Sequence, residues 1–167
     1  ISTLVGGSGD DTFTFTNTGS VTGTVNGAGG INDTLVADDA GRAFVVTGTD
    51  SGTLVVKITG AGWSNIENLT GGTGADTFTI NSGATLTGVV TGGLGNDTLI
   101  QIDGTNTWDV TGADAGDVTD IGSFTGVESL TGGTGDDTFN VASGATLTGI
   151  VDGGAGNNTL TQADGAN

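Results

Sequence analysis

The chain is built from an internal repeat, and this repeat constrains its fold more than any other feature of the sequence. Residues 68–100 and 129–161 align without a gap at an offset of 61 residues, and residues 3–36 are a looser third copy with one inserted residue. We therefore expect one repetitive segment over residues 1–167, with long repeats at about 3–67, 68–128 and 129–167. Because the sequence begins and ends inside a repeat, we treat it as a piece of a longer protein.

A shorter period runs inside the long repeat. The first glycine of each turn recurs in steps of 20 to 23 residues, and an aliphatic residue precedes each glycine by two positions. A step of this length suits one coil of a β-solenoid, in which stacked coils bury their apolar side chains against each other. The spacing predicts an all-β fold, a parallel β-solenoid (β-helix or β-roll) with about eight coils. The predicted buried stripe consists of Leu4, Val25, Val46, Leu69, Val90, Val110, Leu130 and Val151.

The charge of the chain excludes several classes of partner and chemistry. Only 2 residues are basic and 19 are acidic, so the formal net charge is −17. Nucleic acids and anionic membranes are therefore poor partners, whereas cations are natural ones. Cys and His are absent, which removes zinc and copper sites, disulfides and catalysis by thiol or imidazole. No apolar run approaches the length of a membrane span, so we predict no membrane insertion.

A glycine–aspartate motif lies at several of the turns. It reads GGSGDDT at 6–12, GGTGADT at 71–77, GGLGNDT at 92–98 and GGTGDDT at 132–138. This pattern resembles the RTX, or hemolysin-type, calcium-binding repeat. The resemblance implies that carbonyl oxygens of the glycine turn and carboxylates of the aspartates bind Ca²⁺ between successive coils. Here the motif recurs about every 20 residues rather than about every nine, so we expect one corner of each coil to carry it.

We expect the calcium ligands to be the aspartates that follow the glycine turns. Carboxylates on consecutive coils would lie about 4.8 Å apart and repel by roughly 3.5 kcal/mol at an effective dielectric of about 20. Bound Ca²⁺ would convert this repulsion into binding energy, whereas Mg²⁺ prefers stricter geometry and keeps its waters. The alternative is that these side chains only close their own turns by hydrogen bonds. The predicted ligands are a poorer cluster of Asp11 and Asp33 and a main row of Asp76, Asp97, Asp117 and Asp137.

The remaining polar and aromatic residues give weaker signals. Trp63 and Trp108 are predicted to pack at the coil edge, with a ligand-stacking platform as the alternative. A polysaccharide-active enzyme needs paired carboxylates beside an aromatic or basic cleft, and few such residues are available, so we predict no enzyme. An ice-binding face would need a regular outward row of threonines, which the turn positions lack. The acidic residues interpreted as solvated loop charges are Asp38, Asp39, Asp103, Asp109, Asp120 and Asp152.

The sequence therefore favours a structural or adhesive function. The phrases TWDVTGADAGD, FTGVESLTGG and GGTGDDTF are similar to the long β-strand-repeat proteins of bacterial surfaces, which include filamentous and RTX adhesins. This resemblance implies secretion, a place at the cell surface, and a role in adhesion or filament formation, with cell-surface glycans among its partners. Unpaired strand edges at the ends of a solenoid predict self-association, end to end or repeat to repeat. The alternatives are a calcium-independent structural solenoid and a polysaccharide-binding or -processing β-helix.

Overall fold

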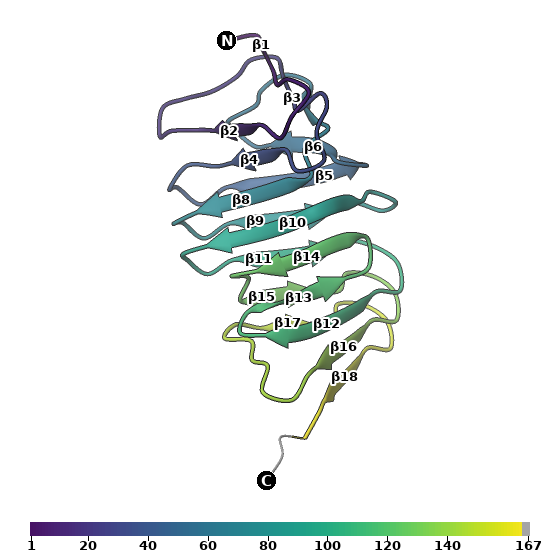
Figure 1. Ribbon diagram of the computed structural model, residues 1–167. Coiled ribbons are helices and arrows are strands. Elements are labelled where there is room, and N and C mark those ends of the chain that lie inside the picture. Colours follow the sequence, from purple (N-terminus) through teal and green to yellow (C-terminus); the bar gives the residue numbers. More distant parts are fainter. Residues whose placement is uncertain (165–167) are drawn as a thin grey trace.

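The computed structural model of the chain describes residues 1–164, and this part is all-β, with two nine-stranded sheets and no helix (Figure 1). The first sheet has the spatial order β1 (Thr3–Val5), β3 (Thr24–Asn26), β7 (Gly62–Ser64), β6 (Ser51–Leu54), β5 (Ala43–Gly48), β9 (Thr77–Ile80), β11 (Thr98–Gln101), β15 (Ser129–Thr131) and β17 (Val151–Asp152). The second sheet has the order β2 (Thr12–Thr14), β4 (Thr34–Val36), β8 (Asn68–Gly72), β10 (Leu86–Gly93), β14 (Ile121–Thr125), β13 (Ala115–Val118), β12 (Thr107–Gly112), β16 (Thr138–Val141) and β18 (Thr159–Gln162).

The strands owe their place in the two sheets to a simple alternation of side chains. A typical strand reads Thr-apolar-Thr, as in Thr77-Phe78-Thr79, and successive side chains of a strand point to opposite faces of the sheet. The apolar side chains of both sheets meet in one core, where Leu35, Leu69 and Leu99 are 0% exposed. The stack is elongated, and its two ends carry the N-terminal and C-terminal strands (Figure 1).

Most neighbouring strands are parallel, but each sheet also contains one antiparallel three-strand meander. These meanders are β5–β6–β7 in the first sheet and β12–β13–β14 in the second. Their first turns contain Asp50 and Asp114, with φ of 44° and 48°, a left-handed conformation that Asp tolerates better than most residues. The Asp50 carboxylate accepts the Thr87 N–H at 2.8 Å, and the Asp114 carboxylate accepts the Thr148 N–H at 2.7 Å. The two meanders are therefore attached to the stack in the same way.

Successive long repeats exchange the two sheets. The glycine–aspartate corners of the first repeat lead from the first sheet to the second, as between β1 and β2, whereas those of the second repeat lead back, as between β8 and β9. The third repeat, with β15 and β16, restores the first arrangement. All strands of a sheet except β6 or β13 run in one direction, so these two kinds of connection lie at opposite edges. We name them edge one (first sheet to second) and edge two (second sheet to first).

The predicted single stripe of eight aliphatic residues is wrong at its meander positions. The pairs predicted within each long repeat are present, namely Leu4–Val25, Leu69–Val90 and Leu130–Val151. The remaining neighbours differ, because Val25 pairs with Trp63, Val46 with Ile80, Val90 with Phe124 and Val110 with Val141. Two of the eight expected coils are meander strands, so the two sheets are compatible with a β-solenoid but do not establish eight equal coils. In residues 1–164, no helix has the length and apolar character needed to cross a membrane.

Candidate functional site

The six predicted ligands lie at three kinds of place rather than along one corner. Asp11, Asp33 and Asp137 lie at edge one, whereas Asp76 and Asp97 lie at edge two, because the repeats exchange sheets. The expectation that the motif corners line up along one edge of the stack is therefore wrong, because they lie at both edges. The sixth residue is not at a corner: Asp117 is exposed on β13, directly opposite Asp109 of β12. Of the main row that the sequence predicted, only Asp76 and Asp97 are neighbours.

We call each successive coil or meander along the stack a level. The corner carboxylates form rows in which each side chain accepts a hydrogen bond from the backbone of the preceding level. In the edge-one acidic row, the Asp11 N–H donates to Asp33 Oδ1 at 2.6 Å, and the Asp33 N–H donates to Glu67 Oε2 at 2.7 Å. These bonds join segments that are 22 and 34 residues apart in the sequence. The predicted pairing of Asp11 with Asp33 is therefore correct in space, and Glu67 extends the row.

A second row of the same design lies at edge two. The Arg42 N–H donates to Asp76 Oδ1 at 2.6 Å, and the Asp76 N–H donates to Asp97 Oδ1 at 2.7 Å. The Asp97 N–H then donates to Glu128 Oε2 at 2.7 Å. We call this the edge-two acidic row. It ends at a glutamate, as the edge-one acidic row does.

The third row, at edge one, contains amides in place of most of the carboxylates. The Asn106 N–H donates to Asp137 Oδ1 at 2.9 Å, and the Asp137 N–H donates to Asn158 Oδ1 at 2.9 Å. The Asn158 Nδ2 also donates to the Gly154 carbonyl oxygen at 3.3 Å. We call this the amide row, because its side-chain N–H groups supply donors that the two acidic rows lack.

Four corner aspartates each bury one carboxylate oxygen without a hydrogen-bond donor. These atoms are Oδ2 of Asp33, Asp76, Asp97 and Asp137, whose residues are 0–1% exposed. A buried acceptor without a donor costs on the order of 1–3 kcal/mol, and more when it is charged. These oxygens are the strongest indication in the structure that the corners accommodate something besides their own hydrogen bonds.

The same Oδ2 atoms leave no room for a side chain on the first residue of the corner, so this residue must be glycine. A Cβ added to Gly71 would overlap both Asp76 Oδ2 and the carbonyl oxygen of Gly92 on the next level. The same pair of clashes recurs at Gly27, with Asp33 Oδ2 and the Asn65 carbonyl oxygen. At each such glycine, a carboxylate oxygen and a backbone carbonyl oxygen therefore converge on the same small space.

Burial also changes the acidity of the edge-two acidic row. Desolvation, together with the smaller effect of the Asp97 charge, raises the pKa of Asp76 to about 6, against the lowering effect of the Arg42 N–H hydrogen bond. Desolvation likewise raises the pKa of Asp97, with the Asp76 N–H opposing it and the Glu128 charge adding to it. The ionised row is therefore under electrostatic strain that a cation or a proton relieves.

Glu67 and Glu128 are candidate site residues that lie outside the glycine–aspartate motif. They follow the two meanders and lie in the related segments NIENLTGG (65–72) and GVESLTGG (126–133), at the 61-residue offset. That recurrence was the available signal. The RTX-like pattern does not include the glutamates, because it starts only at the glycines that follow them.

The two basic residues of the chain both bind one buried carboxylate, that of Asp38. Asp38 is 4% exposed, so the prediction of a solvated loop charge is wrong at this position. Arg42 bonds Asp38 through Nε and, at 2.7 Å, through Nη2, and this pairing holds the pKa of Asp38 well below its usual range. The Lys57 Nζ lies 2.6 Å from Asp38 Oδ2. Neither basic side chain forms an ion pair with a carboxylate of the acidic rows, although the Arg42 charge lowers the pKa of Asp76.

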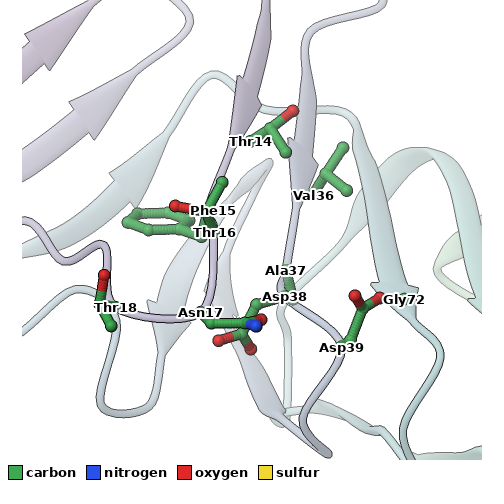
Figure 2. Close-up of a pocket in the computed structure, with 10 residues that line it drawn as sticks. All are labelled: Thr14, Phe15, Thr16, Asn17, Thr18, Val36, Ala37, Asp38, Asp39 and Gly72. Carbon is green, nitrogen blue, oxygen red and sulfur yellow. The ribbon is translucent and has the colours of Figure 1, made fainter.

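Lys57 also holds in place a loop that borders an open pocket. Its Nζ donates to the carbonyl oxygens of Thr16, Asn17 and Gly19 at 3.0–3.2 Å. Figure 2 shows Asn17 and Asp38 on facing segments of this pocket, whose volume is about 520 Å³. The pocket is an open groove lined by threonines and aspartates, with Phe15 largely buried beneath it.

The two tryptophans belong to the core rather than to the coil edge. Trp63 is 2% exposed and Trp108 is 0% exposed, and Trp108 stacks on Phe139 with ring centroids 5.5 Å apart. The predicted edge packing is therefore wrong, and side chains so deeply buried cannot form a ligand-stacking platform. The strands that hold them, β7 and β12, are meander strands, whereas the repeat spacing predicts ordinary coils.

Among residues 1–164, no group of three or more acidic side chains converges on one point. An ion at a corner would therefore take carboxylate oxygens from two neighbouring levels at most and complete its shell with carbonyl oxygens and water. The chain matches no protein-family model, no curated protein and no solved structure.

Proposed function

We propose that the chain is a calcium-stabilised structural segment of a secreted bacterial surface protein or extracellular fibre, built as a β-solenoid. The observation that carries this proposal is the set of buried, donor-free Oδ2 atoms of Asp33, Asp76, Asp97 and Asp137 beside the corner glycines. Calcium is the group that such oxygens suit, because it accepts carboxylates and backbone carbonyls in flexible shells of six to eight oxygens.

The charge distribution supports the same proposal. The acidic rows place carboxylates on successive levels, and the chain holds only 2 basic residues against 19 acidic ones. Both of these basic residues bind Asp38. An external cation is thus the available source of positive charge for the rows. Bound calcium would supply charge neutralisation and a tie between neighbouring levels, and Asp76 and Asp97 with nearby carbonyl oxygens would hold it at edge two.

A calcium-independent structural segment is the second candidate, and the amide row favours it. There, the side-chain N–H groups of Asn106 and Asn158 donate to Asp137 Oδ1 and to the Gly154 carbonyl oxygen, so that this row contains one carboxylate, although Asp137 Oδ2 has no donor. The two candidates differ at the acidic rows, where no side-chain amide stands beside the carboxylates of Asp76 and Asp97.

The ends of the stack support self-association as part of this function. At the C-terminal end, Leu160 is 62% exposed and borders a cavity of about 260 Å³ lined also by Val141, Leu147 and Val151. The outer edges of β17 and β18 have no neighbouring strand in the described structure. Such edges pair readily with strands of another copy or of a further repeat. Adhesion to cell-surface glycans is a further part of the proposal that rests on the sequence resemblance alone.

Thermal unfolding with and without calcium tests the proposal. Circular dichroism would follow the melting of the purified chain in chelator, in excess Ca²⁺ and in excess Mg²⁺. One site at 100-fold excess over its Kd adds about 2.7 kcal/mol of stability, so Ca²⁺ should raise the midpoint strongly and Mg²⁺ only weakly. An unchanged midpoint after chelation leaves the calcium-independent candidate. Light scattering at rising protein concentration tests the self-association, and a strictly monomeric chain would remove it.

A further inference from the structure

We propose that two carboxylate pairs, Asp33–Glu67 and Asp97–Glu128, form two equivalent calcium sites, one in each complete long repeat and one at each edge. The inference rests on the proposed calcium binding and extends it to two glutamates outside the glycine–aspartate motif. It also replaces an unbroken line of ions by one principal site per repeat.

The two pairs are built alike. In each, the aspartate N–H donates to the glutamate Oε2 at 2.7 Å, which leaves Oε1 outside the hydrogen bonds of the row. In each, the aspartate Oδ1 accepts the N–H of the preceding level, that of Asp11 or of Asp76. The two glutamates are 61 residues apart in the sequence, which is the offset of the long repeat.

The second aspartate oxygen of each pair is buried and has no donor. Asp33 is 1% exposed and Asp97 is 0% exposed, and Oδ2 of both lacks a hydrogen-bond partner. Glu67 is itself only 9% exposed. Glu128 is half-buried. Two neighbouring carboxylates of which the aspartate is buried repel each other unless a cation joins them.

A backbone carbonyl oxygen lies near the unpaired aspartate oxygen in both pairs. A Cβ on Gly27 would overlap the Asn65 carbonyl oxygen as well as Asp33 Oδ2, and a Cβ on Gly92 would overlap the Gly126 carbonyl oxygen and lie against Asp97 Oδ2. Asn65 and Gly126 each lie two residues before the glutamate of the pair. In both places the aspartate Oδ2 and a carbonyl oxygen therefore lie beside the same glycine, and the glutamate is bonded to the backbone of that aspartate. Oxygens of aspartate, glutamate and carbonyl groups are the ligands that Ca²⁺ prefers.

The remaining corners lack part of this set. In the amide row, Asp137 is followed by Asn158 rather than by a second carboxylate. At the Asp76–Asp97 step, Oδ1 of the second carboxylate accepts the Asp76 N–H, and its Oδ2 lies beside Gly92 and the Gly126 carbonyl oxygen, where it belongs to the Asp97–Glu128 pair. Only where a meander ends does a longer glutamate side chain bring an additional carboxylate oxygen to the corner.

Isothermal titration of the whole chain with CaCl₂ tests the two pairs. The variants are Glu67→Gln, Glu128→Gln and the double variant, because glutamine keeps an oxygen that accepts the aspartate N–H. Asp39→Asn is the matched control, since Asp39 is exposed and loses the same charge. The wild type and the control should bind two calcium ions with similar affinity. Each single variant should weaken one of these sites by about tenfold or more, and the double variant should weaken both.

Melting in chelator separates loss of binding from loss of fold. Wild type and variants should unfold at similar midpoints without calcium, and the double variant should lose most of the rise that calcium produces in the wild type. If the glutamine variants keep two sites of unchanged affinity, the two pairs are wrong while calcium binding at the corners stands. If the wild type binds no calcium, the calcium-stabilised function and the two calcium pairs are both wrong.

Discussion

The backbone N–H of Asp76 donates a 2.7 Å hydrogen bond to Oδ1 of Asp97, which lies 21 residues later in the chain and one level further along the stack. The motif aspartate therefore acts between levels, where it holds the backbone of its neighbour. Only Asp11 also closes its own turn in the described structure, by accepting the Gly7 N–H at 2.5 Å. The repeat length matters because the side chain of one corner must meet the backbone of the next.

Replacing Gly71 by alanine should destabilise the chain strongly. The added Cβ would overlap Asp76 Oδ2 and the Gly92 carbonyl oxygen, and backbone atoms on a neighbouring level cannot move aside easily. Overpacking of this kind costs about 1–3 kcal/mol or more. Urea unfolding followed by circular dichroism would measure the loss.

Gly9→Ala is the matched control for this substitution. Gly9 belongs to the same type of corner, but nothing lies within 4 Å of an added Cβ there. Its stability should match the wild type within about 0.5 kcal/mol. Equal losses in the two variants would show that the glycines are needed for chain conformation rather than for the approach of the two oxygens.

Replacing Lys57 by methionine should cost about 3–5 kcal/mol of unfolding free energy. The change removes one of the two cations from the buried Asp38 and leaves the carbonyl oxygens of Thr16, Asn17 and Gly19 without their shared donor. Val55→Met, in the neighbouring exposed turn, is the control and should have little effect. A Lys57 variant as stable as the control would mean that the buried ion pair contributes nothing net.

The local elements of the fold could be predicted from the sequence, whereas the path between them could not. Thr-apolar-Thr segments and glycine–aspartate turns predict strands and corners, and the 21-residue spacing places Leu69 correctly beside Val90. The segment that starts at Ala43 has the same alternation as the motif strands, so its antiparallel return is not visible in the pattern. The one local sign of a hairpin in the sequence is the turn GTDSGT at 48–53, which lacks the double glycine; in the structure its Asp50 is left-handed.

The candidate site was predictable where one residue type in one motif defines it. Asp76 and Asp97 were found because the glycines mark them. Asp117 has the motif's distance from its glycine, Gly112, but lies on a meander strand rather than at a corner. Glu128 was missed because its place beside Asp97 depends on a meander that brings the chain back to edge two. Contacts made by non-local topology leave no spacing rule in the sequence.

Replacing Val56 by asparagine should stabilise the chain by about 1 kcal/mol, which raises the melting temperature by about 2–4 °C in a chain of this size. Val56 has φ of 63°, a left-handed conformation that strains a β-branched residue and that asparagine tolerates. Its side chain is 61% exposed, so little packing is lost. Val55→Asn, whose backbone lacks that conformation, should bring no gain in differential scanning calorimetry. Equal effects at both positions would exclude backbone strain as the cause.

In chelator, the chain should lose stability as the pH rises from about 4 to above 6. Burial raises the folded-state pKa of Asp76 to about 6, above the ordinary value near 3.8, so the folded chain holds this proton more tightly than the unfolded chain between those values. Ionisation above that window therefore weakens the fold. Asp97, with its pKa raised in the same direction, adds to the effect.

Asp76→Asn should flatten this pH dependence, whereas Asp39→Asn should keep it. Urea midpoints measured in chelator at several pH values between about 4 and 7 would compare the two variants with the wild type. At still lower pH, a separate loss is expected, because Asp38 has a lowered pKa and its ion pairs weaken as it becomes protonated. A wild-type profile that rises through the window, or a slope that Asp76→Asn leaves unchanged, would contradict the burial argument.

Asp97→Asn should have opposite effects with and without calcium. In calcium, the variant should be the least stable of the single corner Asp→Asn variants, because Asp97 has carboxylate neighbours on both sides, Asp76 and Glu128. In chelator, it should equal or exceed the wild type, by about 1 kcal/mol, because its amide can supply a donor where the wild type buries an unpaired Oδ2. Asn158 already does this in the amide row, where Nδ2 donates to the Gly154 carbonyl oxygen at 3.3 Å.

Urea unfolding of this variant and of Asp103→Asn, an exposed control, would be measured in both conditions. If Asp97→Asn is less stable than the wild type in chelator as well, the carboxylate stabilises the corner by itself, and the unpaired oxygen does not indicate a cation.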